Sequence, residues 1–297
     1  YHIDIDDKTV FAGKAYRYPD NEYLEICVND VVKNYLKSDF PELLNRNNKM
    51  ENYFKPVTIE TSDDNVFDYS FYNDWSYVGK PIGWSIILND PISNKIVPWQ
   101  FVFSSVFCPN TTDGVDIYER GIRDSTYTTY LGGQTYMCRP STTMLCGETL
   151  EFVISNTDRS VSYVLDNTDK EYVLYYVNAN GGWDSLVVDG NVLKTDDIQS
   201  ELYRNKTYDF KTFDNTKYRN IIKPRWTLHT GYLSNEQASK MHHLLESTQV
   251  YLHHKGDSIC PVIITNSSCE YKTFTNNGKK KFYYTIEVES SKDKYRQ

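Results

Sequence analysis

The chain lacks the features that mark a membrane protein, a nucleic-acid binder or a zinc protein. Its 297 residues contain no run of about 18 apolar residues, so we expect a soluble chain without a membrane segment. The formal net charge of -8 argues against a general nucleic-acid binder, which needs cations to neutralise phosphates. The six cysteines are well separated and form no CxxC pair, which favours free thiols over a zinc site or a disulfide framework.

Catalytic signatures are missing as well. No Walker A loop, GxGxxG turn after a strand or GxSxG elbow occurs, and the glycine pairs at 132–133 and 181–182 are too short to cradle a phosphate. We therefore expect no catalytic residues and no cofactor. A glycosidase would need two carboxylates, but turn and surface chemistry explain the candidates equally well. These candidates are Asp63, Asp64, Asp68 and Asp74.

Four of the six histidines lie within the stretch MHHLLESTQVYLHH, residues 241–254. On the helix predicted there, neighbouring residues are about 100° apart, so His242 flanks the apolar stripe and His243 points away from it. His253 and His254 are neighbours on a strand and face opposite sides of the sheet. The four side chains therefore do not converge, and we expect no metal site.

Aromatic residues are abundant, at 15% of the chain with 26 tyrosines, and this favours strands over helix bundles. Short strands separated by turn residues run from about Pro56 to Asp158, which predicts a β-sandwich or barrel. We expect three parts. They are a strand–helix segment at 1–55 that could dock on the C-terminal domain, a sandwich-like domain at 56–158, and a β-rich α+β domain at 159–297.

The C-terminal part contains the clearest local signals of secondary structure. SNEQ is a capping box that begins one helix, from about Ser234 to Ser247. NNGK, residues 276–279, predicts a hairpin turn, and DGN, residues 189–191, suggests another. The text from 116 to 136 is expected to be a long connection or an irregular strand pair, and the text from 206 to 220 a polar stretch. The predicted fold is mainly β with one capped helix.

Several passages resemble virion proteins of Bacteroidales phages, including the crAss-like phages. The passages that carry the resemblance are GGWDSLVVDGNV (181–192), HTGYLSNEQASKMHHLLESTQVYLH (229–253) and CPVIITNSSCEYKTFTNNGKKKFYYTIEVE (260–289). The opening FAGKAYRYPDNEYLEICVNDVVKNYL and the central NDWSYVGKPIGWSIILNDPI are similar in style. None of these passages is a catalytic signature, so no family site residues are carried over.

The resemblance implies a non-enzymatic structural protein that forms a ring in the neck, tail barrel or tail hub of the virion. Its partners would be copies of itself and the adjacent ring, portal-side or hub proteins, while DNA passes without sequence-specific binding. Such a protein would be made in the host cytoplasm. Cyclic rings use heterologous contacts, which edge strands and aromatic loops can supply. The interface candidates are Tyr127, Tyr130, Tyr136, Trp183, Asn276, Asn277, Gly278, Lys279, Lys280 and Lys281.

A second reading is a carbohydrate-binding module or adhesin of a phage or a gut bacterium. Exposed tryptophans would form a platform for sugar rings, whereas tryptophans next to strands are more often core or subunit-contact residues. The sequence leaves both possibilities open for Trp75, Trp84, Trp99 and Trp183.

Overall fold

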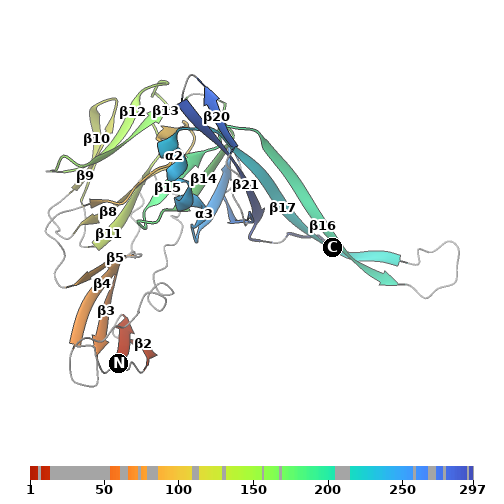
Figure 1. Cartoon of the computed structure of the whole chain (residues 1–297), viewed down its shortest axis with the longest axis horizontal. Helices are drawn as coiled ribbons and strands as arrows, with labels where there is room; N and C mark the ends of the chain where they lie inside the picture. The colour runs from red at the N-terminus through yellow and green to blue at the C-terminus, as the bar shows by residue number, and fades with distance from the viewer. Residues whose placement is uncertain are drawn as a thin grey trace. The chain divides into compact units, whose positions relative to one another are not determined.

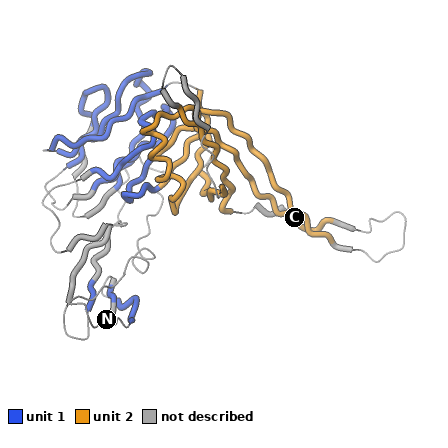
Figure 2. Tube along the Cα trace, viewed as in Figure 1, with its two compact units in different colours: residues 1–167, 177–184 blue, residues 168–176, 185–297 orange. Residues whose placement is uncertain are grey.

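The computed structural model divides the chain into two compact units (Figure 2). Unit 1 comprises residues 1–167 and 177–184, and unit 2 comprises residues 168–176 and 185–297. The three-part division predicted from the sequence stays a prediction. The structure describes residues 1–5, 8–13, 54–60, 66–72, 75–78, 86–108, 114–128, 132–155, 157–166, 169–204, 215–256, 259–266, 272–276, 279–292 and 294–296.

The N-terminal part of unit 1 is a five-stranded antiparallel sheet in the order β2-β1-β3-β4-β5. Ile3 and Ile59 pair across β1 and β3, and both side chains are buried. The strands are β1 (His2–Ile5), β2 (Lys8–Ala12), β3 (Phe54–Glu60), β4 (Val66–Tyr72) and β5 (Trp75–Val78). The helix predicted within residues 1–55 lies outside the described residues.

Two further sheets of unit 1 share one hydrophobic core, as the sequence predicted for a sandwich. Strand β12 shows why: its alternate residues, Leu150, Phe152 and Ile154, are buried while those between them are not. One sheet has the order β10-β9-β12-β13-β7 and the other β11-β8-β6. The strands are β6 (Ile86–Ile87), β7 (Lys95–Ile96), β8 (Val102–Cys108), β9 (Gly114–Glu119), β10 (Ile122–Thr128), β11 (Gly132–Cys138), β12 (Thr149–Ile154) and β13 (Ser160–Leu165).

The stretch from 116 to 136 contains an irregular strand pair, one of the two alternatives expected from the sequence. Strands β9 and β10 form a hairpin whose two turn residues, Arg120 and Gly121, have φ values of 57° and 74°. Two consecutive positive φ values are the signature of a tight two-residue hairpin turn. The register of β10 against β9 shifts between Arg123 and Ser125, which makes the pair irregular.

Unit 2 is built on a nine-stranded sheet whose main order is β15-β14-β18-β19-β21-β17-β16, with β20 paired to β21 and β22 paired to β17 (Figure 1). The DGN turn does not make the suggested hairpin, because β15 and β16 lie at opposite ends of this sheet. The strands are β14 (Tyr172–Val177), β15 (Trp183–Val187), β16 (Val192–Arg204), β17 (Asn215–Leu233), β18 (Val250–His254), β19 (Cys260–Ile264), β20 (Lys272–Asn276), β21 (Lys279–Ser290) and β22 (Lys294–Arg296).

The capping box is confirmed at the start of the helical segment. The Ser234 hydroxyl accepts from the Gln237 N–H at 3.2 Å, and the Ser234 N–H donates to the Gln237 side chain at 2.9 Å. The helical residues are divided into α2 (Asn235–Ser239) and α3 (Met241–Leu245), with a turn at Lys240.

The structure corrects the expectation for the helical histidines. His243 is buried and His242 is exposed, although the helical wheel placed His243 farther from the apolar stripe. Met241 and Leu244 are buried as the wheel predicted, so α3 is covered on a second side, which the apolar stripe alone does not indicate.

Candidate interaction surface on the β16–β17 ribbon

The most distinctive feature of unit 2 is a two-stranded ribbon that extends beyond the rest of its sheet (Figure 1). Strand β16 has 13 residues and pairs with the 19-residue strand β17 from Val192↔Leu228 to Arg204↔Asn215. Strand β21 accompanies β17 only from Arg225 to Leu233. We call the remaining part, residues 196–204 and 215–224, the arm. Among the described residues, only the short strand β22 pairs with β17 along the arm.

The arm has two chemically different faces, because neighbouring residues on a strand point to opposite sides and directly paired residues to the same side. Trp226 and Leu228 of β17 are buried on one face, which we call the core face. Lys194 pairs with Trp226 and places its Nζ 5.8 Å from the centre of that ring. Farther along the arm, Ile198 pairs with Ile222 on the same face.

Toward the Leu233 end of β17, where this strand pairs with β21, the helical segment lies against the core face. The helix α2 contacts both β17 and β21, and the Tyr284 hydroxyl of β21 donates to the Ala238 carbonyl at 3.3 Å. Met241 and Leu244 of α3 are buried. The hydrophobic core of unit 2 therefore lies between the sheet and these two helices.

Apolar side chains continue along the core face into the arm, where they are exposed. Ile198 and Leu202 are 58% and 56% exposed, and Ile222 is half-buried. We call these three residues the apolar patch. A two-stranded ribbon is only marginally stable by itself, and no second layer of described residues buries these side chains. The apolar patch is therefore suited to burial against another molecule.

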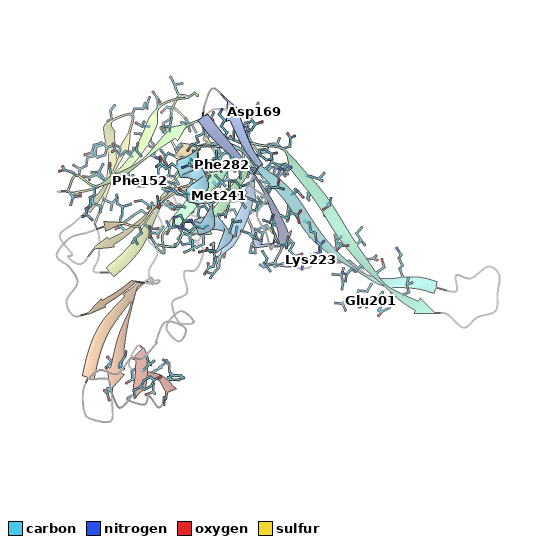
Figure 3. All side chains as sticks on the ribbon, viewed as in Figure 1. Phe152, Asp169, Glu201, Lys223, Met241 and Phe282 are labelled. Atoms are coloured by element: carbon cyan, nitrogen blue, oxygen red, sulfur yellow. The ribbon has the colours of Figure 1, made fainter. Side chains whose placement is uncertain are left out.

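The opposite face of the arm is ionic near β21. Glu289 of β21 accepts from Lys223 at 2.6 Å and lies 3.5 Å from Arg225, which is also 3.4 Å from Asp197 of β16. These contacts join β16, β17 and β21 across three strands. Figure 3 labels Lys223 near this junction and Glu201 farther out along the ribbon. The ionic contacts orient the arm where it leaves the wider sheet.

The arm also contains an irregularity near its outer end. The register of β16 against β17 shifts between Glu201 and Leu202, so Tyr218 is the extra residue of a β-bulge. A hydrogen bond to the Glu201 carboxylate is the main reason that the pKa of Tyr218 lies above its usual range. Bulges increase local twist, so this one changes how the ribbon presents its outer residues.

Strand β16 is an edge strand, since its outer side pairs with no strand in the part of the chain that the structure describes. A long unpaired edge can accept a strand from another chain. Exposed charged residues such as Lys194 and Asp196 limit indiscriminate pairing at such an edge. A strand that pairs with this edge would therefore need charges opposite to those of Lys194 and Asp196, which disfavours general aggregation.

A second exposed surface lies where β17 pairs with β21, and we call it the aromatic group. His229 stacks on Tyr283 with ring centroids 5.3 Å apart, and Tyr232 lies 6.1 Å from Tyr283. Lys281 places its Nζ 5.7 Å from the centre of the Tyr232 ring, which belongs to a side chain that is 62% exposed. These four residues present rings and a cation together.

A bulge brings the aromatic group onto one face. His229 and Tyr232 are three positions apart, so they would point to opposite sides of a regular strand. The register shifts between them, and Gly231 has a φ of 73°. A Cβ at Gly231 would lie 2.9 Å from the Cβ of Asp189, so both the backbone conformation and the space favour glycine here.

The predicted interface residues do not form one surface. Tyr136 and Trp183 are buried in unit 1 and are core residues there. For Trp183, this burial favours the core position over the exposed sugar platform that the sequence also left open. Lys281 belongs to the aromatic group. Tyr127 lies in β10, and Asn276, Lys279 and Lys280 lie in the β20–β21 hairpin that NNGK predicted. Tyr130, Asn277 and Gly278 lie outside the described residues.

The arm was not predicted from the sequence. Residues 206–220 were expected to be a polar stretch, and residues 192–204 contain few apolar side chains. The alternation of Ile222, Pro224, Trp226 and Leu228 with polar residues indicates a strand just after that stretch. The pairing of β16 with β17 reveals the ribbon.

Comparisons with known proteins give no relative. No protein family, no curated protein and no solved structure matches the chain. Within the described ranges, no group of three or more histidine, cysteine, aspartate or glutamate side chains is arranged to hold a metal ion. The same residues contain no helix that is long and apolar enough to cross a membrane.

Proposed function

We propose that the chain is a structural subunit of a bacteriophage virion. It assembles into a ring in the head-to-tail neck, the tail barrel or the tail hub, around the channel for DNA and ejected proteins. The resemblance of residues 181–192, 229–253 and 260–289 to virion proteins supports the setting. The arm, with its exposed apolar patch and open β16 edge, is the observation that carries the assembly role.

The arm supplies what a subunit contact requires. Burying Ile198 and Leu202 contributes on the order of 1–2 kcal/mol for each side chain, and strand pairing at the β16 edge adds directional hydrogen bonds. In a cyclic ring one face of a subunit meets a different face of its neighbour. The arm is one face of such a contact, and the adjacent subunit supplies the other.

The overall charge supports the same proposal. A formal net charge of -8 disfavours tight contact with phosphates, so a channel built from such subunits lets DNA slide. Partners in the particle are the adjacent ring, portal-side or hub proteins. The chain is made in the host bacterial cytoplasm and ends in the virion.

The native mass of the purified chain, together with negative-stain images, tests this proposal. Wild type is expected to form closed rings of a fixed subunit number. The double variant Ile198→Lys with Leu202→Lys should remain folded but fail to form rings, because two cations replace the exposed apolar side chains. Leu145→Lys is the matched control, since Leu145 is 68% exposed and belongs to unit 1 rather than to the arm.

Two results would count against the proposal. A wild-type chain that stays monomeric at every concentration contradicts self-assembly into rings. Rings that persist in the double variant and disappear in the Leu145→Lys control contradict the role of the arm while leaving assembly itself in place.

A second candidate function is carbohydrate binding, which the aromatic group favours. Exposed tyrosine rings stack on sugar rings, and His229, Thr285 and Lys281 offer polar groups beside them. Under this reading the chain binds specific oligosaccharides on a glycan array, and Tyr232→Ala loses that binding. Ring formation with no glycan bound supports the structural role instead.

A further inference from the structure

Unit 1 buries a carboxylate, Asp184, in β15. The residue is 1% exposed. It belongs to the segment 177–184, which is part of unit 1, whereas the residues before and after this segment, 168–176 and 185–297, are part of unit 2. No described basic side chain forms a salt bridge with it. An ionised carboxylate in such a position is costly unless hydrogen bonds replace the lost water.

Three donors supply those hydrogen bonds. Asp184 Oδ1 accepts from Asn89 Nδ2 at 2.9 Å, and Oδ2 accepts from Asn178 Nδ2 at 2.6 Å and from the Asp90 N–H at 3.0 Å. Asn89 and Asp90 are more than 90 positions away in the sequence. The carboxylate therefore links the segment 177–184 to the chain after β6.

Further contacts hold the same segment in place. Asn178 also donates to the Leu88 carbonyl at 2.9 Å and accepts from the Gly182 N–H at 2.9 Å. The Trp183 N–H donates to the Ser105 hydroxyl of β8 at 2.9 Å. A Cβ at Gly182 would lie 3.0 Å from the Leu88 carbonyl oxygen, so the two backbones approach closely. The segment is anchored by one buried polar cluster centred on Asp184.

The balance of burial and hydrogen bonding decides the protonation of this cluster. Burial raises the pKa of Asp184 from 3.8 to about 6, although the bonds from Asn178, Asn89 and the Asp90 N–H lower it. The charge of Asp90 adds a smaller upward contribution. Two other titratable groups lie in this region, Tyr163 and Cys138. Burial is the main reason that the pKa of Tyr163 is raised, and the charges of Asp184 and Cys138 raise it further.

We propose that Asp184 makes the anchoring of the segment 177–184 pH-dependent, so that unit 1 holds this segment more tightly as the solution becomes acidic. A group with a higher pKa in the folded state binds its proton more tightly there than in the unfolded chain. Its stabilising contribution is complete below pH 3.8 and is lost as the pH rises through about 6. The inference concerns unit 1 and does not depend on the proposed function.

Hydrogen exchange of the peptide covering 177–184, in the full-length chain, tests this inference. After correction for intrinsic exchange rates, wild-type protection should rise by about tenfold or more from pH 7.5 to pH 4.5, relative to the Asp184→Asn variant. Taking the difference from Asp184→Asn cancels the contributions of all other carboxylates. Asp158→Asn, an exposed carboxylate of unit 1, is the matched control and should follow wild type.

A gentler variant tests the inference if Asp184→Asn does not fold. Asp90→Asn keeps the backbone N–H that donates to Asp184 and removes only the neighbouring charge, so the midpoint of the pH dependence should move to lower pH. Equal pH slopes in wild type and Asp184→Asn overturn the inference. If Asp184→Asn is unfolded, an unchanged midpoint of the pH dependence of protection in Asp90→Asn also overturns the inference.

Discussion

The polar cluster of unit 1 and the arm of unit 2 depart from the usual distribution of side chains in opposite directions. In unit 1 the carboxylate of Asp184 and the amide of Asn178 are buried, and the half-buried Asn89 and backbone groups complete their hydrogen bonds. In the arm, isoleucine and leucine lie outside, without a second layer over them. The cluster uses polarity to fix one chain segment within its own unit, whereas the arm leaves apolar surface for something else. The polar cluster therefore completes the fold of unit 1, whereas the arm presents a surface suited to a partner molecule.

The largest expected effect on stability comes from Trp183, which the sequence offered as an interface candidate. Its side chain is fully buried and lies 6.2 Å from the Phe103 ring, centroid to centroid. Trp183→Ala should lower the free energy of unfolding by about 3–5 kcal/mol, because it leaves a large cavity. Urea unfolding of the full-length chain measures this. A stable variant with altered native mass would instead make Trp183 a subunit contact.

A smaller loss is expected from Ser105, which supports the same cluster through a single hydroxyl. Ser105 Oγ accepts from the Trp183 N–H and lies 2.7 Å from the Thr135 hydroxyl. Ser105→Ala leaves a buried N–H without its acceptor and should lower the free energy of unfolding by about 1–3 kcal/mol. Ser160→Ala, at an exposed position of β13, should change it by less than about 0.5 kcal/mol. Equal losses in both variants would show that the buried hydroxyl has no special role.

The smallest effect is expected where the arm joins the sheet. Glu289→Gln removes the charge that faces Lys223 and Arg225, and the free energy of unfolding should fall by no more than about 1 kcal/mol, because the basic partners are partly solvated. Urea unfolding at low and high salt checks this, since salt should shrink the difference. Glu236→Gln, at an exposed helical pair with Lys240, is the control. A loss as large as that of Trp183→Ala would mean that these ion pairs hold the sheet together.

Local signals in the sequence were sufficient for much of the fold. The alternation in residues 149–154 and the capping box at Ser234 both depend on neighbours a few positions apart, and both are confirmed. The NNGK hairpin is confirmed by the pairing of Asn276 with Lys279. Each of these features is specified by the geometry of one strand, one turn or one helix end.

Features that depend on distant partners were not predictable in the same way. The arm exists because residues 192–204 pair with 215–228. The alternation of Ile222, Pro224, Trp226 and Leu228 with polar residues indicates a strand, but it does not indicate which segment pairs with that strand. The DGN turn was expected to form a hairpin, but β15 pairs with the preceding strand, β14, and β16 with the following strand, β17. The buried state of Asp184 depends on Asn89 and Asp90, more than 90 positions earlier. An aspartate after GGW carries no local sign of burial.

The continuity of β17 has a mechanical consequence. One unbroken strand of 19 residues, about 60 Å long at the usual rise per residue, runs from the arm into the covered core of unit 2. A pull on the arm along that strand loads the hydrogen bonds to β16 and β21 in shear, so many of them resist together. A sideways push instead bends a two-stranded ribbon, which is compliant. The arm is therefore expected to be stiff in tension and flexible in bending.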